Sequence, residues 1–495
     1  MNPALPTLIQ ALLEPHLYRG NVTHVELVQT HISWVILAGA FAYKIKKPVA
    51  LPFLDFSTLA LRKKYCEDEL RLNRRFSPTI YLDVVGIFNT PQDPRFKGSG
   101  QPIEYAVKMH RFDAAARLDR VCDRGELRFE HLSELAVTLT AFHAIAQQAP
   151  PGSRYGSPNA VIAPMRESLR DLLAWLPHGD APARLAALQR WTDAQFIQLI
   201  PLLQARQQLG CVRECHGDLH LANLALIDQQ VQMFDCIEFS EDLRWIDVAS
   251  EVAFTYIDLI AHVQPGHANW FINEVWEQTG DYEAALVFRF YAVYRALVRA
   301  KVAAVRMQQT GQGDAESMAY IALAEGLAVS QPLSLVITHG LSGCGKTTAS
   351  SKLLQGDTRT RTVRLRSDTE RKRMFRLAGS ARSGSGTEAG IYTPSAGART
   401  YQRLYVLTDM LLGSGWSVIV DATFLKRADR DLFRALAAHH TAAFSILAPQ
   451  ATVEQLRERI LARQTQRKDA SEATLDVLTR QLRAIEPLGP QERTL

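Results

Sequence analysis

The chain contains an eight-residue segment, Gly340-Leu-Ser-Gly-Cys-Gly-Lys-Thr347, that matches the phosphate-binding pattern G-x-x-x-x-G-K-T. The apolar run 333–339 before it predicts a buried strand, and residues 348–354 after it predict the start of a helix. Glycine lets successive backbone N–H groups turn toward one phosphate, and the N-terminus of the helix adds positive potential. The residues predicted to bind the phosphates are Gly340, Ser342, Gly343, Cys344, Gly345, Lys346, Thr347 and Thr348.

Three residues in and after this segment predict a nucleotide site with a metal ion. Lys346 would reach the β- and γ-phosphates of ATP and act in catalysis, and the Thr347 hydroxyl would bind Mg²⁺. The apolar strand predicted over 417–421 ends in Asp421, which fits the carboxylate that supports Mg²⁺ opposite a phosphate loop. The sequence therefore predicts ATP and Mg²⁺ as cofactors of this part of the chain.

With the phosphate loop and Asp421-Ala-Thr423, residues 333–490 resemble the AAA, zeta-toxin-like and gluconate-kinase-like P-loop families. The resemblance implies that the strand predicted over 362–368 ends facing an acceptor. Asp368 is then a catalytic candidate that binds or deprotonates an acceptor hydroxyl, with Arg371 on the same face. The alternative is that Asp368 only caps a helix.

The same resemblance implies a lid whose arginines neutralise the phosphoryl group during transfer. Arg459, Arg463 and Arg467 recur every fourth residue and share one predicted helical face. Arg463 is the preferred catalytic arginine of this lid. The alternative is a solvated basic surface.

A second pattern lies earlier in the chain, where His216-Gly-Asp-Leu-His-Leu-Ala-Asn223 fits H-x-D-x-x-x-x-N, the catalytic-loop pattern of kinases. Asp218 would orient and deprotonate an acceptor hydroxyl, and Asn223 would bind Mg²⁺ through its amide oxygen. The short strand predicted over 231–235 ends in Asp235, and a hairpin would return this carboxylate beside Asn223 as a second metal ligand. His216 is expected to hold the loop rather than bind metal.

Residues 20–310 resemble the aminoglycoside phosphotransferase-like kinases, which share the protein-kinase fold. The resemblance implies a lysine for the α- and β-phosphates, and Lys44 is preferred over Lys46, which lies on the same strand face. Its expected helix partner is Glu69, with Glu67 as the alternative. Asp247 is expected to stabilise the catalytic loop. A glycine-rich lid is not visible, and Cys236 stands where a glycine normally follows the metal-binding aspartate.

The length of 495 residues favours two or three domains. A β-rich start and a helix-rich body precede Ser330-Gln-Pro332, so we expect domains at 1–325 and 326–495. The predicted fold is a bilobal α+β protein-kinase-like domain followed by an α/β P-loop NTPase domain with a parallel sheet. Residues 331–495 carry 25 Lys and Arg against 15 Asp and Glu, and the remainder carries 31 against 36, which supports two different domains.

The expected function is a bifunctional ATP-dependent phosphotransferase that acts on hydroxyl groups of unidentified small molecules. One alternative makes the first domain a nucleotide-sensing pseudokinase. Another makes the chain a nucleic-acid 5′-hydroxyl kinase, which the sparse aromatic residues of the basic part disfavour. No signal peptide or membrane-spanning run is apparent, and the six scattered cysteines suggest reduced thiols, so we expect a cytoplasmic protein without a membrane partner. The patterns do not indicate an oligomeric state.

Overall fold

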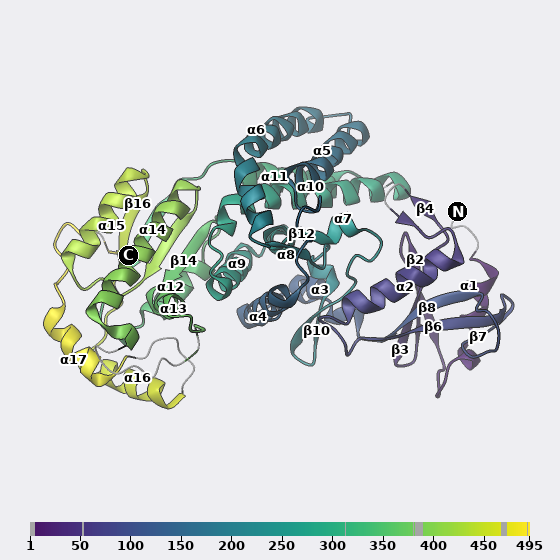
Figure 1. Cartoon of the computed structure of the whole chain (residues 1–495), viewed down its shortest axis with the longest axis horizontal. Helices are drawn as coiled ribbons and strands as arrows, with labels where there is room; N and C mark the ends of the chain where they lie inside the picture. The colour runs from purple at the N-terminus through teal and green to yellow at the C-terminus, as the bar shows by residue number, and fades with distance from the viewer. Residues whose placement is uncertain are drawn as a thin grey trace. The chain divides into compact units, whose positions relative to one another are not determined.

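A computed structural model describes residues 5–51, 54–311, 313–379, 381, 390–466, 473–492 and 494–495 (Figure 1). Contacts within the chain define two compact units. The first unit joins Met1–Pro164 to Leu203–Asp258, and the second joins Met165–Leu202 to Leu259–Leu495. The domain boundary predicted at 325/326 stays a prediction. Among the described residues, no helix is both long and apolar enough to cross a membrane.

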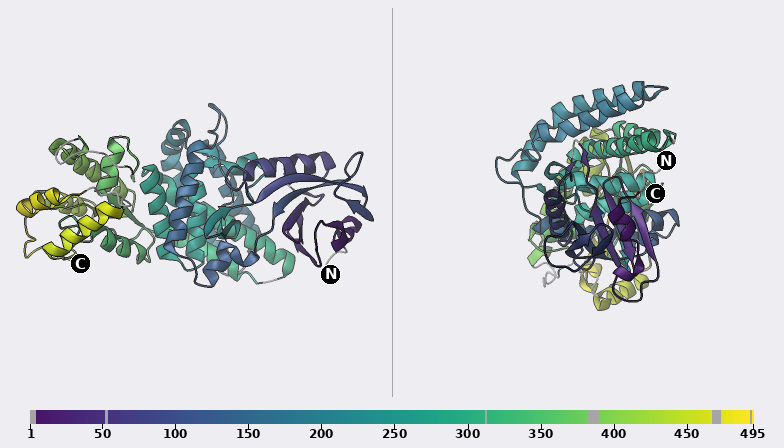
Figure 2. Two further views of the ribbon diagram at one scale, coloured as in Figure 1. Left: turned by 90° about the horizontal axis from the view of Figure 1, so that it is seen from below. Right: turned by 90° about the vertical axis from the view of Figure 1, so that its right-hand side faces the viewer.

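An antiparallel sheet forms the amino-terminal part of the first unit, with strand order β1-β2-β3-β8-β6-β7 among the described residues. Its strands are β1 (Val25–Gln29), β2 (Ser33–Ala38), β3 (Phe41–Lys46), β6 (Tyr81–Thr90), β7 (Asp93–Arg95) and β8 (Glu104–His110). Helix α2 (Leu59–Asn73) packs against β8 and β6 (Figure 1, Figure 2). Short elements complete this part: α1 (Thr7–Ala11), η1 (Pro15–Leu17), β4 (Ala50–Leu51) and β5 (Leu54–Asp55).

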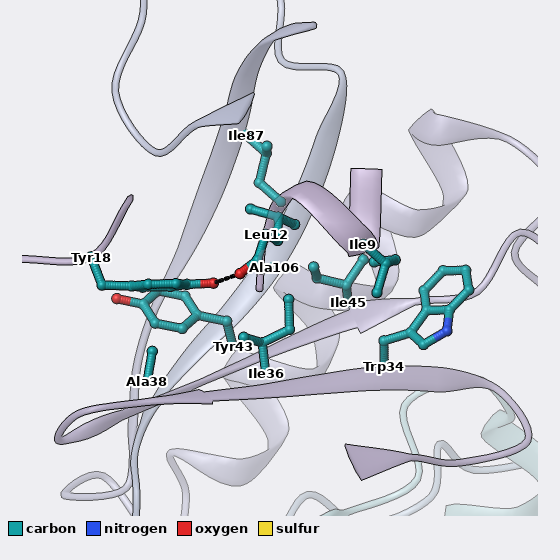
Figure 3. Packing of buried hydrophobic residues seen from close by; sticks show 10 residues of the cluster. All are labelled: Ile9, Leu12, Tyr18, Trp34, Ile36, Ala38, Tyr43, Ile45, Ile87 and Ala106. Carbon is teal, nitrogen blue, oxygen red and sulfur yellow. Dashed lines mark hydrogen bonds between the residues drawn. The ribbon is translucent and has the colours of Figure 1, made fainter. Parts of the chain in front are cut away.

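The alternation of side chains along β3 separates an apolar core from a pair of lysines. Figure 3 shows Tyr43 and Ile45 packed with residues of α1 and β2, where the Tyr18 hydroxyl donates to the Leu12 carbonyl oxygen at 2.6 Å. Since successive side chains of a strand point to opposite faces, Lys44 and Lys46 lie on the other face of β3. The apolar core therefore fixes the face on which the lysines are presented.

The rest of the first unit combines helices with two short pairs of strands. Strands β10 and β11 pair antiparallel with Leu224 opposite Met233, and β9 pairs with β12. The elements are η2 (Ala114–Ala116), α3 (Leu118–Asp123), α4 (Phe129–Ile145), the start of α5 (Pro158–Trp175), β9 (Val212–Glu214), η3 (Leu221–Asn223), β10 (Leu224–Ile227), β11 (Gln230–Met233), α7 (Glu241–Arg244), β12 (Trp245–Asp247) and α8 (Val248–Ala261). The hairpin predicted to return Asp235 toward Asn223 is confirmed.

The second unit contains a parallel sheet with strand order β14-β15-β13-β16. Its strands are β13 (Ser334–Thr338), β14 (Thr362–Arg366), β15 (Ser417–Asp421) and β16 (Ala443–Leu447). The central strands are buried on both faces, which explains their continuous apolar sequences. Around the sheet lie α12 (Lys346–Gln355), α13 (Ser367–Met374), η4 (Gly390–Tyr392), α14 (Pro394–Gly413), α15 (Arg427–His439), α16 (Val453–Gln466) and α17 (Leu475–Ala484).

Long helices belong to this second unit as well: most of α6 (Ala181–Gln208), α9 (Pro265–Thr279), α10 (Ala284–Thr310) and α11 (Ala315–Ala328). Two differences from the sequence prediction stand out. The sequence does not predict α9, and the pattern of residues 243–262, which predicts one helix, is interrupted by β12. The interruption has a physical cause, because Asp247 ends β12 and accepts the Ala249 N–H, which starts α8 after the strand.

Candidate active sites

Lys44 joins two carboxylates in the first unit. Its Nζ lies 2.8 Å from Glu69 Oε1 and 2.5 Å from Asp235 Oδ1. Burial alone would lower the pKa of the Lys44 ammonium, but Asp235 and Glu69 raise it well above its ordinary value, so the lysine stays charged. The structure thus brings together the lysine, the helix glutamate and the hairpin aspartate predicted from sequence. Glu67, the alternative partner, pairs instead with Lys63.

Lys46 forms a second, fully buried arrangement on the same glutamate. Its Nζ lies 2.8 Å from Glu69 Oε2 and also pairs with Glu238. Burial alone would raise the pKa of Glu69, but the two ammonium groups lower it to about 2, so this carboxylate is ionised. Because the Lys46 side chain is buried and the Lys44 side chain is 11% exposed, Lys44 is the lysine that a phosphate can reach. Glu238 was missed in the sequence, where only the absent glycine marked this segment as unusual.

The catalytic-loop pattern folds into a tight turn that joins Asp218 to Asn223. The Asn223 Nδ2 donates to Asp218 Oδ2 at 3.2 Å and to the Asp218 carbonyl oxygen at 2.9 Å. The Phe234 N–H donates to the Asn223 carbonyl oxygen at 3.0 Å, which brings the next residue, Asp235, to the same place. An amide oxygen and a carboxylate are the hard donors that Mg²⁺ takes.

His216 holds this loop from inside. Its Nδ1 accepts the Asp218 N–H at 3.3 Å, and its Nε2 lies 2.8 Å from the Phe234 carbonyl oxygen. These partners require a neutral ring with the proton on Nε2, and burial lowers the pKa of His216, which agrees with that state. The ring therefore ties the strand of Asp235 to the loop of Asp218, as expected from the sequence.

Helix α8 supplies the residues that anchor the loop backbone. Glu251 accepts the N–H groups of His216 at 2.9 Å and Gly217 at 2.7 Å, and Asp258 accepts the Leu221 N–H at 2.9 Å. Asp247 has the structural role expected of it, because its carboxylate pairs with Arg206 and caps α8. Glu251, one turn further along the chain, is the residue whose carboxylate holds the loop backbone.

The Glu251 anchor predicts a pH dependence of stability. Burial would raise the pKa of this carboxyl, but His143 and the Gly217 N–H lower it from 4.5 to about 2. A lowered pKa stabilises the fold above pH 4.5, and this stabilisation, on the order of 3 kcal/mol, is lost as the pH falls toward 2. Urea unfolding at pH 7 and pH 3.5 should show a smaller loss on acidification in Glu251→Gln than in the wild type. An identical loss would contradict the assignment.

The phosphate loop lies at the carboxyl end of β13 and runs into α12. Gly343 and Gly345 adopt φ of 88° and 95°, a region that side chains with a Cβ rarely enter. Helix α12 begins at Lys346, so its first N–H groups open toward the loop. The Lys346 ammonium donates to the carbonyl oxygens of Gly340 at 3.0 Å and Leu341 at 2.8 Å. Strand, loop and helix therefore occur in the predicted order.

Two carboxyl-terminal helices also contact the loop. The Ser342 N–H donates to Gln481 Oε1 of α17 at 2.8 Å, so a side chain already occupies this predicted phosphate donor. Arg459 of α16 donates to the Gly343 carbonyl oxygen at 3.2 Å, which places this predicted lid arginine beside the loop. Arg463 lies within α16, but its side chain is outside the described residues, as is all of Arg467.

Asp421 lies at the end of β15, next to the loop strand. Its Oδ2 accepts from Ser350 Oγ at 3.3 Å, and its Oδ1 lies 3.5 Å from Thr338 Oγ1. The side chain is 5% exposed, and Arg366 Nε of the neighbouring strand lies 4.0 Å away. Since parallel strands end at one edge of a sheet, this position suits a carboxylate that faces the loop of Thr347.

Asp368 lies in the first turn of α13, directly after β14. Arg371 Nη1 donates to Asp368 Oδ1 at 3.2 Å, and the Arg371 guanidinium lies 5.1 Å from the centre of the Tyr392 ring. The structure therefore brings the two residues expected on one face together with an aromatic ring. The glycine- and serine-rich segment 382–387, whose sequence predicts a loop, lies outside the described residues.

These features define the class of protein. A phosphate loop with its lysine, and a lysine–glutamate–aspartate cluster beside an H-x-D-x-x-x-x-N loop, identify an ATP-dependent kinase. The predicted fold class is confirmed, with a kinase-like antiparallel sheet followed by a P-loop domain with a parallel sheet.

Comparison with known proteins finds a family match within the second unit and relatives that span most of the chain. Residues 335–488 match the family model of the AAA domain. The uncharacterized proteins Rv2004c of Mycobacterium tuberculosis (strain ATCC 25618 / H37Rv) and Mb2027c of Mycobacterium bovis are each 29% identical to the chain over 479 residues. These alignments cover 95% of this chain and 94% of each relative.

Two solved structures are also similar. Choline kinase from Cryptosporidium parvum Iowa II is 12% identical with a TM-score of 0.42, covering 65% of this chain and 95% of that chain. A putative kinase from Chloroflexus aurantiacus J-10-fl is 26% identical with a TM-score of 0.27, covering 33% of this chain and 87% of that chain.

Proposed function

We propose that the chain is a bifunctional phosphotransferase that moves the γ-phosphoryl group of Mg-ATP to hydroxyl groups of small molecules at two separate sites. The observation that carries the proposal is the bridge from Lys44 to both Glu69 and Asp235, because a kinase site uses a lysine, a helix glutamate and a metal-binding aspartate in this combination. The phosphate loop with Lys346 supplies the second site.

At the first site, Lys44 holds the α- and β-phosphates while Asp218 aligns the acceptor hydroxyl and takes its proton. Asn223 and Asp235 would hold Mg²⁺, since they offer oxygen donors at one end of the hairpin. Mg²⁺ neutralises charge on the β- and γ-phosphate oxygens when bound.

At the second site, the loop amides and Lys346 hold the phosphates, and Thr347 with Asp421 would hold Mg²⁺. Asp368 binds or deprotonates the acceptor hydroxyl, and Arg371 holds its carboxylate in place. The lid formed by α16 would bring Arg459 and Arg463 to the transferred phosphoryl group. The contact of Arg459 with the Gly343 carbonyl oxygen supports this arrangement.

The test is transfer from labelled ATP to a metabolite extract, with the phosphorylated products identified by mass spectrometry. The wild-type chain should yield at least one new phosphomonoester, and the Asp218→Asn/Lys346→Ala double variant should yield none. The matched control carries Asp228→Asn and Lys352→Ala, two exposed positions outside both sites, and should behave as the wild type. Equal product from the wild type and the double variant would refute the proposal.

A further inference from the structure

Strand β14 forms one edge of the parallel sheet, and helix α9 covers this edge (Figure 1). Asn273 Nδ2 donates to the Thr362 carbonyl oxygen at 2.8 Å, and its Oδ1 accepts the Arg364 N–H at 2.7 Å. Asn269 accepts the Thr362 N–H at 3.3 Å and donates to the Leu354 carbonyl oxygen at 3.1 Å. An asparagine amide carries both a donor and an acceptor. These two side chains therefore form the hydrogen bonds with the backbone of β14 that a neighbouring strand would form.

The close approach of α9 is built into its sequence. Asn269, Asn273 and Glu277 recur every fourth residue and so lie on one face of the helix. One turn earlier, a Cβ on Gly266 would lie 1.9 Å from the Gln355 carbonyl oxygen, so only glycine fits there. Helix α9 precedes the segment 335–488 that matches the AAA domain, yet it packs as an integral layer of that domain.

The third residue of this face, Glu277, reaches the end of the sheet where the phosphate loop lies. Its Oε1 accepts from Arg366 Nη1 at 2.8 Å and from Thr369 Oγ1 at 3.1 Å, and its Oε2 lies 3.3 Å from Arg364 Nη2. Burial alone would raise the pKa of Glu277, but Arg366 and Arg364 lower it, so the carboxylate is charged.

Arg366 lies between two carboxylates at unequal distances. Its Nη1 is 2.8 Å from Glu277, whereas its Nε is 4.0 Å from Asp421 Oδ2. A guanidinium in full contact with Asp421 would compete with a cation for the same oxygens, since a carboxylate that is already paired binds a metal less well. The closer contact with Glu277 therefore leaves the Asp421 carboxylate available.

We propose that Glu277 is a positioning residue of the P-loop site: from a helix outside the matched domain, it holds Arg366 away from Asp421 and so preserves the Mg²⁺ affinity of that carboxylate. This inference rests on the proposed function of the P-loop site. Helix α9 would then belong to the second active site, because buried side chains connect the helix to that site.

The test measures ATP binding calorimetrically in the full-length chain carrying Asp235→Asn, which removes the metal carboxylate proposed for the first site. Each variant is titrated with ATP in Mg²⁺ and in EDTA, so the Mg²⁺-dependent part reports the P-loop site. Glu277→Gln should weaken Mg-ATP binding at least fivefold and change binding in EDTA less than twofold. Adding Arg366→Gln should restore Mg-ATP binding to within twofold of the parent. The exposed control Glu283→Gln should leave both unchanged.

The outcomes separate the inference from the function on which it rests. If Lys346→Ala leaves binding unchanged, the proposed P-loop function fails. If Lys346→Ala removes Mg²⁺-dependent binding while Glu277→Gln behaves as Glu283→Gln, only the inference fails. Equal weakening in Mg²⁺ and EDTA, or a loss that Arg366→Gln does not repair, would show a merely structural role. If Glu277→Gln does not fold, the single variant Arg366→Gln tests the inference. The inference requires that this variant bind Mg-ATP at least as tightly as the parent, and weaker binding would refute it.

Discussion

Asp218→Asn is expected to reduce phosphoryl transfer at the first site by roughly a hundredfold to ten-thousandfold, the usual contribution of a positioned base. Asparagine keeps the size of the side chain and can still face the Asn223 amide, which lies 3.2 Å from Asp218 Oδ2. It cannot take a proton from an acceptor hydroxyl. Lys44 and Asp235, which we propose to hold the nucleotide and its metal ion, are unchanged, so the KM for ATP should change less than threefold.

The measurement uses the Lys346→Ala background, in which the remaining ATP turnover belongs to the first site. Asp228→Asn is the matched control, because Asp228 lies in the turn between β10 and β11, is exposed and has a φ of 50° that asparagine adopts readily. It should retain turnover within twofold. Turnover of Asp218→Asn equal to that of Asp228→Asn would mean that the first unit does not use this aspartate in catalysis.

Local sequence patterns were sufficient to locate both candidate sites. The phosphate loop is contiguous because successive amides must face one phosphate, and the spacing of Asp218 and Asn223 is fixed by a single turn. Asp235 could be placed because a hairpin has a definite register. The parallel sheet followed from apolar runs that alternate with helical segments.

The residues that hold these sites in place could not be found in the same way. Glu238, Glu251 and Glu277 are single acidic residues, and each acts on a group far along the chain, so no local spacing marks them. Helix α9 escaped prediction because Asn269 and Asn273 interrupt its apolar pattern with residues usual at surfaces. The burial of these two asparagines cannot be inferred from the local sequence, because it depends on the edge strand β14 that they cover.

The sequence analysis prefers Lys44 over Lys46, but the strand pattern alone does not separate the two lysines. Alternation places both on one face of β3. The structure separates them through their second carboxylates, because Lys46 is enclosed with Glu238 while Lys44 reaches Asp235, whose side chain is 45% exposed. Tertiary contact, rather than strand period, decides which lysine faces a ligand.

Lys346→Ala is expected to lower phosphoryl transfer at the second site by roughly a hundredfold to a thousandfold, the usual effect of removing one preorganised donor from a developing charge. The Lys346 ammonium lies at the mouth of the loop, 3.0 Å from the Gly340 carbonyl oxygen and 2.8 Å from that of Leu341. The glycine φ angles and the start of α12, which shape the loop, are unchanged when the side chain is removed. The fold should therefore survive the substitution.

The Asp218→Asn background isolates this activity, and Lys352→Ala is the matched control, because Lys352 is an exposed lysine of the same helix α12. ATP turnover should fall only in Lys346→Ala, and Mg-ATP should no longer raise the melting temperature of the second unit in that variant, since a ligand stabilises only the fold that binds it. If Lys346→Ala loses ATP turnover but Mg-ATP still raises its melting temperature, Lys346 acts only in the chemical step. Equal ATP turnover in Lys346→Ala and Lys352→Ala would mean that the phosphate loop takes no part in catalysis.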